Sequence, residues 1–461
     1  MTEWTLCLDF GTAYSKAAAA PTGAWARFDP ATVRPLMLAG EEAETNPFLL
    51  ESAVFVDDQQ VLFGSAAVQR ADQFSGGKRR ALRSFKTLLS VSDLDRALAT
   101  NVPGSIDPHR LFQMRDLIVL YLAYLLAAIN RAAGQDGDIS QATGLKVRYA
   151  APAWRDADSA GTHASILRLF GEAEALRNAL GKKLLSPEGL SMALVTKAVP
   201  KAMAAPEPLE MSLIFEAPAA AAYTSIGLRD AGSHFIVVDM GAGTTDIAGL
   251  VRDRDGIQEL ADARYTLKQA GDFLDGIIAN RVLKAASWAR GTEAQTALWA
   301  MLMRQMADVK ETLFAEGRVS IRAQGRGVTV AMRDIERDQD FREFIKTLEH
   351  AYEHSIAVVR GDALVRGRAE VEAIAVGGGA AAPFIQALVK QKYRGKPRVT
   401  ARPATPDWAH APVFAGNLAP VFPQLAIAIG GALAPDEMLA VNGGGVRRLA
   451  AGRNDTQAAR D

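Results

Sequence analysis

Two short segments of the chain place a carboxylate beside a turn that is rich in glycine and threonine, and these residue types together suit phosphate chemistry. The first segment contains Asp9, Gly11 and Thr12, and the second contains Asp239 followed by residues 241–246 (Gly-Ala-Gly-Thr-Thr-Asp). In each, an apolar run ends in Asp and the turn leads into a second strand-like run. Two such hairpins facing each other would hold the phosphates of one nucleotide and its metal between two parts of the chain.

The residue types explain why these turns suit phosphate. Glycine lets the backbone approach a ligand closely, and successive N–H groups in such a turn form a concavity that binds anions. Thr12, Thr244 and Thr245 add hydroxyl donors. Carboxylates bind Mg²⁺, which usually retains water and bridges phosphate oxygens, so Asp9 and Asp239 are the candidate metal residues. The alternative is two ordinary hairpins with Gly and Asp in their turns.

Two further motifs fit a nucleotide site. Residues 374–383 (Ile-Ala-Val-Gly-Gly-Gly-Ala-Ala-Ala-Pro) predict a strand, a glycine turn and a helix, and the lack of side chains there would let a base or ribose lie against the backbone. The motif is equally compatible with a tight connection between a strand and a helix. Glu216 precedes an alanine-rich helix, which suits a crossing between two domains that pivot. The same sequence is equally typical of a plain helix in a core.

Composition excludes some classes of function. Among 461 residues, 52 are Lys or Arg and 52 are Asp or Glu, so there is no basic surplus and we expect no nucleic-acid partner, a local basic patch aside. Cys7 is the only cysteine, which fits a reducing compartment and predicts a cytoplasmic protein. We expect no signal peptide. The longest apolar run, residues 117–129, is shorter than the ~20 residues of a membrane span and predicts a buried core helix.

The elements that must position these motifs alternate between strands and helices in two similar halves. This predicts an α/β protein with an internal duplication. We expect lobe I at 1–232, with an inserted subdomain at about 46–115, and lobe II at 233–440, with an insertion at about 270–345. The last helix, near 424–435, is expected to return to lobe I, and residues 441–461 to form a flexible tail.

Several elements follow from hydrophobic periodicity and from the positions of glycine and proline. Single helices are expected at 78–100, 110–133, 159–180 and 296–316. Residues 187–208 are rich in Ala and Pro and are expected to form a broken stretch without a regular helix.

Taken together, the two hairpins, the Glu216 connector and the glycine turn resemble the superfamily of actins, sugar kinases and heat-shock-chaperone ATPases. The resemblance covers roughly residues 5–435 and is nearest to the heat shock protein 70 (DnaK-type) nucleotide-binding domain. Four segments carry this nearer resemblance: 63–67 followed by 84–89, 151–154, 271–275 and 310–313. It implies a duplicated ribonuclease H-like fold, two lobes with a central nucleotide cleft, and ATP or ADP with Mg²⁺ as cofactor.

The resemblance also implies roles for residues that match the family's motifs. Lys86, Glu216 and Asp246 would be catalytic, and Asp9 and Asp239 would organise the metal. The residues implied in nucleotide binding are Gly11, Thr12, Ala13, Tyr14, Lys16, Gly241, Ala242, Gly243, Thr244, Thr245, Gly271, Asp272, Lys310, Gly377, Gly378 and Gly379.

The chain departs from the family at several of these positions. The connector's proline is delayed to Pro218, and Ala307 and Glu311 stand where the chaperones usually carry Glu and Arg beside the adenine. Lys16 occupies a position at which actins and many sugar kinases carry a phosphate-binding basic residue. The lysine that contacts phosphate is therefore Lys16, Lys86 or both.

The predicted function is that of a slow, Mg-dependent ATPase that acts as a chaperone-like nucleotide switch on a protein partner. We expect no peptide-binding β-domain, because only about twenty residues follow the last motif. Two alternatives remain: an actin-like filament protein, with self-association, and a metabolite kinase that uses the same clamp. We see no convincing sugar-binding cluster for the second.

Overall fold

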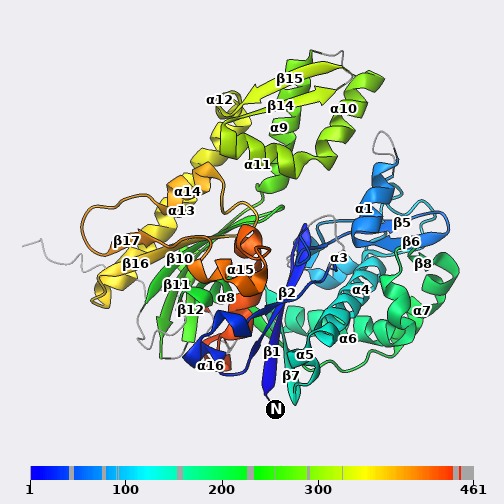
Figure 1. Cartoon of the computed structure of the whole chain (residues 1–461), viewed down its shortest axis with the longest axis horizontal. Coiled ribbons are helices and arrows are strands. Elements are labelled where there is room, and N and C mark those ends of the chain that lie inside the picture. The colour runs from blue at the N-terminus through cyan, green and yellow to red at the C-terminus, as the bar shows by residue number, and fades with distance from the viewer. Residues whose placement is uncertain are drawn as a thin grey trace, which may run out of the picture.

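The computed structural model describes residues 2–40, 46–74, 79–89, 91, 93–152, 159–225, 233–254, 256–287, 291–323, 325–439 and 446–447. These residues form a mixed α/β protein with two large sheets and two small ones, as the alternation of strands and helices predicts (Figure 1). The expected tail at 441–461 lies outside the described residues, apart from the short strand at 446–447.

The first large sheet contains the first hairpin and orders its strands β3-β2-β1-β7-β9, with β4 also paired to β2. Its strands are β1 (Glu3–Phe10), β2 (Tyr14–Pro21), β3 (Arg34–Pro35), β4 (Leu50–Glu51), β7 (Gly144–Ala151) and β9 (Met211–Phe215). Strand β1 pairs antiparallel with β2 and parallel with β7. Residues 17–20 of β2 are four fully buried alanines, small enough for the close approach of a helix.

The second large sheet orders its strands β17-β16-β10-β11-β12-β18, with β13 paired to β11. Its strands are β10 (His234–Met240), β11 (Thr245–Asp253), β12 (Gly256–Leu260), β13 (Tyr265–Leu267), β16 (Glu370–Val376), β17 (Arg398–Ala401) and β18 (Val446–Arg447). Strand β10 pairs antiparallel with β11 and parallel with β16, the same directions that β1 has with β2 and β7.

The two hairpins also share their register. Asp9 lies opposite Lys16 across β1 and β2, and Asp239 lies opposite Asp246 across β10 and β11. In each hairpin one more residue pair follows before the turn, so both turns contain four residues. Equivalent positions of the two hairpins therefore carry a cation in one case and a carboxylate in the other.

The first half surrounds its sheet with helices and a small sheet. The helices are α1 (Gly64–Asp72), α2 (Phe85–Leu89), α3 (Leu94–Leu98), α4 (Met114–Gln135), α5 (Gly137–Ser140), α6 (Ser159–Leu180), α7 (Met192–Ala204) and α8 (Glu216–Ala222). The small sheet is made of β5 (Val54–Val56), β6 (Gln60–Phe63) and β8 (Leu190–Ser191). Within the described residues, α4 alone is long and apolar enough to cross a membrane; 78% of its apolar window is buried, so it is the core helix that the sequence predicts.

The second half carries a peripheral group of helices and a hairpin, drawn at the top of Figure 1. These elements are α9 (Gly271–Ala286), α10 (Glu293–Arg304), α11 (Met306–Glu316), β14 (Arg318–Ala323), β15 (Arg326–Ala331) and α12 (Met332–Glu336). The remaining helices are α13 (Gln339–Val365), α14 (Pro383–Val389), α15 (Phe422–Leu433) and α16 (Asp436–Leu439).

Helices α8 and α15 cross between the two large sheets (Figure 1). Helix α15 contacts β1 and β2 of the first sheet and β16 of the second, although it follows the second half in the chain. Arg148 of β7 donates hydrogen bonds to the carbonyl oxygens of Gly431 and Ala434, at 2.6 and 2.7 Å, and pairs with Asp436. These bonds satisfy carbonyls at the C-terminal end of α15 and attach that end to the first sheet.

Gly430 sets the close approach of α15 to α8, because an added Cβ would lie 2.0 Å from the carbonyl oxygen of Ala219. We expect Gly430→Ala to lower the free energy of unfolding by about 2 kcal/mol, since the backbone of α8 must move. The control is Gly361→Ala on α13, where an added Cβ meets nothing within 4 Å and better helix propensity should stabilise by about 0.5–1 kcal/mol. Chemical denaturation measures both, and equal stability of the two variants would contradict this packing.

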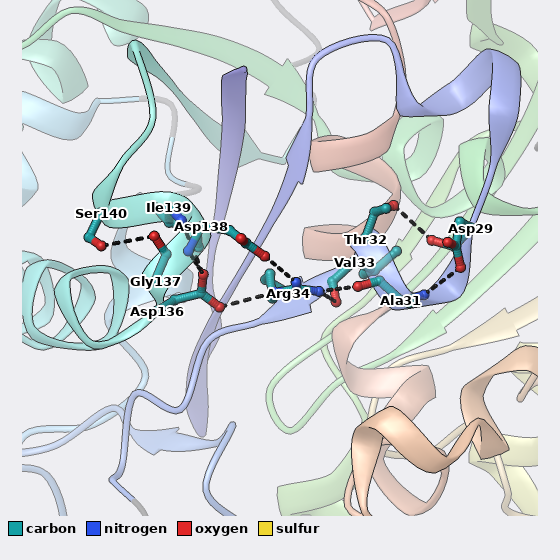
Figure 2. A network of polar contacts seen from close by, with 10 residues as sticks. All are labelled: Asp29, Ala31, Thr32, Val33, Arg34, Asp136, Gly137, Asp138, Ile139 and Ser140. Carbon is teal, nitrogen blue, oxygen red and sulfur yellow. Dashed lines mark hydrogen bonds and ion pairs between the residues drawn. The ribbon is translucent and has the colours of Figure 1, made fainter. Parts of the chain in front are cut away.

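A second polar network attaches β3 to the end of α4. The Arg34 guanidinium pairs with Asp136 at 3.0 Å and with Asp138 at 2.6 Å, and Asp136 caps the first turn of α5 (Figure 2). On its other side, Arg34 donates to the carbonyl oxygen of Ala31. The edge strand β3 is thereby held against the core helix of its own half.

Three expectations about helices were wrong. Residues 192–204 form a regular helix, α7, with Pro200 inside it, because Val195, Val199 and Ala202 share a buried face and tertiary packing outweighs the proline. The helix expected at 296–316 is divided at Gln305 into α10 and α11. Among the described residues of the helix expected at 78–100, only α2 and α3 are helical, and Leu82 instead forms a β-bridge with Val54.

Candidate functional site

A cavity of about 690 Å³ lies between the two halves of the molecule and is lined by the turns of both hairpins. Most of the residues singled out from the sequence line it: Asp9, Gly11, Thr12, Ala13, Tyr14, Lys16, Lys86, Asp239, Gly241, Ala242, Thr244, Gly271, Lys310, Gly377, Gly378 and Gly379. The structure thus brings together residues that are separated by more than 300 positions in the chain.

The first hairpin turn needs its glycine. An added Cβ at Gly11 would lie 2.3 Å from the carbonyl oxygen of Tyr14 and 3.0 Å from Lys16 Nζ. The Lys16 ammonium lies 2.7 Å from Asp9 Oδ2, and both side chains are almost completely buried. A cation and a carboxylate therefore stand side by side beneath the turn.

A second buried ion pair enters the site from other elements. Lys86 of α2 lies 2.8 Å from Glu216 Oε1, at the start of α8. Burial raises the pKa of Glu216 above its usual value, and Lys86 opposes that rise. Burial alone would lower the pKa of Lys86, but the carboxylates of Glu216, Asp9 and Asp239 raise it well above its usual value. Lys86 is therefore a permanent cation in the middle of a group of carboxylates.

Asp239 is the last residue but one of β10 and lies beside the glycine turn of the third motif. Burial raises the pKa of Asp239 to about 6, and the neighbouring carboxylates of Asp246 and Asp9 contribute to the rise. Gly377 has a φ of 81°, and an added Cβ there would lie 2.3 Å from Asp239 Oδ1. The Gly379 N–H donates to the carbonyl oxygen of Met240 at 2.8 Å. Only glycine permits this contact between the end of β16 and the end of β10.

Asp246 and Glu216 do not line the large cavity. They share a small cavity of about 30 Å³ with Asp239, next to the large one, and it has room for about one or two water molecules. Asp246 is held by the hydroxyls of Thr244 and Thr266, which donate to it at 2.9 and 2.6 Å. Its orientation is thus fixed toward the end of β10.

Three other predicted residues lie outside the large cavity. Thr245 is fully buried and donates to the carbonyl oxygen of Gln269, which is a structural contact. Gly243 does not line the cavity of about 690 Å³ between the hairpin turns. Asp272 lines a different cavity, of about 860 Å³, that extends between α1 and α10. Of the segment 151–154, Ala153 and Trp154 lie outside the described residues.

Sequence reasoning missed part of the cavity wall. Helix α11 lines it with Phe314 and Ala315, in addition to Ala307, Lys310 and Glu311, which the resemblance already places beside the adenine; all five recur at helical spacing and form one face. This spacing in the sequence could have predicted that these residues share one face of a helix. Pro423, Gln424 and Ile427 from the first turns of α15 also line it, and the Gly377 N–H donates to the carbonyl oxygen of Pro423 at 2.8 Å. No local sequence pattern predicts the contact between Gly377 and Pro423.

The site fits a phosphate-bound metal better than a metal held by protein ligands alone. Asp9 Oδ1 is buried and has no hydrogen-bond partner among the described residues. In the same part of the chain, no group of three or more His, Cys, Asp or Glu side chains is arranged to hold a metal. Separate carboxylates with a free oxygen suit Mg²⁺, a hard cation that keeps several waters and takes phosphate oxygens as ligands.

One comparison with known proteins bears on this site. Residues 205–411, a little under half of the chain, match the family model described as Hsp70 protein. The match begins before α8 and ends before α15, so it includes the second hairpin, α11 and the glycine turn. It supports an Hsp70-like nucleotide-binding domain and, at the level of the family, a chaperone-like ATP-binding function. A search of curated proteins found no match to the chain.

Proposed function

We propose that this protein binds Mg-ATP between its two halves and hydrolyses it slowly, as a chaperone-like nucleotide switch. The observation that carries the proposal is that both hairpin turns, with Asp9 and Asp239 at their bases, line one cavity. A triphosphate between the turns would meet main-chain N–H groups from both sides, since turns of this kind bind anions.

Asp9 and Asp239 would hold the metal through its waters. Bound Mg²⁺ supplies positive charge to the phosphate oxygens and so stabilises the charge that develops during phosphoryl transfer. Asp9 has a buried oxygen free for this role, and Asp239 contacts the cavity directly.

The catalytic assignment follows the charges around the phosphate position. Lys86 is a permanent cation that would orient the terminal phosphate, and its partner Glu216 would orient the attacking water together with Asp246. Lys16, already paired with Asp9, would provide a second phosphate contact from the first hairpin. Positioning and electrostatic stabilisation are the main contributions that a protein makes to this reaction.

The far end of the cavity would take the base and ribose. Leu274, Ala307 and Phe314 give the cavity lining apolar surface, and Gly378 and Gly379 add backbone without side chains. The alanine and glycine surfaces suit a flat ring, and Gly271 and Lys310 also line the cavity.

The switch would operate by rotation of two lobes, at 1–232 and 233–440, that arose by duplication. The equal strand directions and the equal register of the hairpins support this division. Helices α8 and α15 lie between the lobes and would form the pivot, so that loss of the terminal phosphate opens the cleft. The nucleotide state would then be recognised by a partner protein, in a reducing compartment such as the cytoplasm.

Thermal unfolding tests the proposal. With Mg-ATP at about 100 times its dissociation constant, we expect a gain of about 2.7 kcal/mol in the free energy of unfolding and a melting temperature higher by a few degrees. AMP with Mg²⁺ is the control, because it lacks the phosphates that reach both hairpins. No shift with millimolar Mg-ATP would contradict nucleotide binding.

A further inference from the structure

A buried tyrosine of the core helix α4 touches a direct neighbour of each of three charged residues of the site, Asp9, Lys16 and Lys86. Phe10 follows Asp9, Ser15 precedes Lys16, and Phe85 precedes Lys86. Tyr121 contacts all three neighbours, and its own side chain is fully buried. The mechanism proposed above does not use this residue.

The ring of Tyr121 packs against two other aromatic rings, and the three rings form a triangle of mutual contacts. Its centroid is 4.9 Å from that of Phe85, with an interplanar angle of 19°, and 5.5 Å from that of Phe10, at 21°. Phe10 and Phe85 are themselves 5.8 Å apart. Stacked aromatic pairs add stabilisation beyond the area that they bury, so the three rings behave as one packed unit.

The hydroxyl of Tyr121 fixes the other side of the first hairpin. It lies 3.0 Å from Ser15 Oγ and donates toward Ser52 Oγ at 3.3 Å and the carbonyl oxygen of Glu51 at 3.2 Å. Ser15 and Ser52 also bond to each other at 3.0 Å. Burial raises the pKa of Tyr121, so its hydroxyl remains a neutral donor.

We infer that Tyr121 is a positioning residue, which sets the distance between Lys86 and the first hairpin that carries Asp9 and Lys16. Helix α2, which carries Lys86, has only five residues, so its place depends on packing rather than on its own stability. Phe85 packs α2 on the ring of Tyr121, and Phe10 packs the hairpin on the same ring, so Tyr121 contacts both segments at once. The inference rests on the proposed function for its catalytic consequence, but the placement of Lys86 can be tested without nucleotide.

Three variants test this inference. Tyr121→Leu removes the stack, and Tyr121→Phe keeps the ring and removes only the hydroxyl. Tyr124→Leu is the matched control, because Tyr124 lies on the same helix and stacks on Phe63, which neighbours none of the three charged groups; Tyr124 meets Tyr121 only in a tilted contact, with ring centroids 6.0 Å apart. All measurements are made well below each variant's melting temperature, so that every protein is folded.

The first readout needs no nucleotide. Acetylation of lysines by an amine-reactive ester, followed by mass spectrometry, reports the accessibility of Lys86, which is 14% exposed and paired with Glu216. We expect Lys86 to react several-fold faster in Tyr121→Leu than in wild type and to remain protected in Tyr121→Phe and Tyr124→Leu. Continued protection of Lys86 in Tyr121→Leu, or equal loss in Tyr124→Leu, would overturn the inference.

The second readout is the hydrolysis of Mg-ATP. In Tyr121→Leu we expect kcat to fall by about 10- to 100-fold with KM changed by about threefold or less, because a displacement of order 1 Å affects the reacting geometry more than binding. Tyr121→Phe should recover most of kcat, and Tyr124→Leu should keep wild-type values. A similar fall in kcat in both Leu variants would show a general structural effect and overturn the inference. If the wild-type protein neither binds nor hydrolyses Mg-ATP, the proposed function fails, and the acetylation result alone decides the role of Tyr121.

Discussion

Replacing Asp239 by Asn is expected to lower Mg-dependent ATP hydrolysis by about 100- to 1,000-fold while leaving the protein folded. Asn has nearly the same shape as Asp but carries no charge to attract Mg²⁺. Because burial already raises the pKa of Asp239 to about 6, removal of its charge relieves a cost in the nucleotide-free protein. The melting temperature of the free variant should therefore equal or exceed that of wild type.

The control for this change is Asp253→Asn, at the other end of the same hairpin and outside the cavity. It removes an equal charge and should leave hydrolysis unaltered. Steady-state phosphate release measures both variants, and thermal unfolding verifies that both are folded. Wild-type hydrolysis by Asp239→Asn would remove the metal assignment, whereas a large loss of melting temperature would show that the carboxylate has a structural role.

Replacing Lys86 by Met is expected to lower hydrolysis by about 100-fold or more, with little change in nucleotide affinity. It should also destabilise the protein by about 3 kcal/mol, because Glu216 then remains buried without its partner. The double variant Lys86→Met/Glu216→Gln removes both charges of the pair. It should regain most of the lost stability and none of the activity, so a double-mutant cycle separates folding from catalysis.

Lys16→Met is the companion variant, since Lys16 and Lys86 both line the cavity and both pair with a carboxylate. If Lys16 is a second phosphate contact, its loss should weaken binding of ATP more than it lowers the rate of the bound complex. Single-turnover hydrolysis and a binding titration separate the two effects. If Lys86→Met were fully active and Lys16→Met inactive, Lys16 and not Lys86 would be the lysine that orients the terminal phosphate.

The sequence predicted the hairpins well because their information is local. An apolar run, an Asp at its end and a glycine turn are encoded within about a dozen residues, and the register that pairs Asp9 with Lys16 and Asp239 with Asp246 follows from turns of equal length. The prediction that both turns line one cavity depended, in addition, on the resemblance to a known superfamily. Local pattern alone could not have shown it.

The errors have physical causes of two kinds. Pro200 lies inside α7, where packing of Val195 and Val199 against the core outweighs the local penalty of proline. Helix propensity is a local property and does not report such tertiary packing. The contribution of α15 to the cavity and the contact of Tyr121 with Phe10 and Phe85 depend on segments far apart in the chain, so neither spacing nor composition reports them.

The structure places Glu311 in the lining of the cavity, and its role stays a prediction. It stands on the cavity-facing side of α11, beside Phe314 and Ala315, where the resemblance implies a different residue next to the base. With small side chains at Ala307 and Ala381, the cavity lining offers less side-chain surface for stacking than an arginine would provide. We therefore expect weaker stacking of the base in this cavity.

The most direct test of the account is the position of the metal. A crystal structure with Mn²⁺ in place of Mg²⁺ and a non-hydrolysable ATP analogue would locate the ion by its anomalous signal. The account predicts one ion between the two hairpin turns, bound to phosphate oxygens and connected through water to the carboxylates of Asp9 and Asp239. An ion and triphosphate bound away from these two carboxylates, or in contact with only one hairpin, would contradict it.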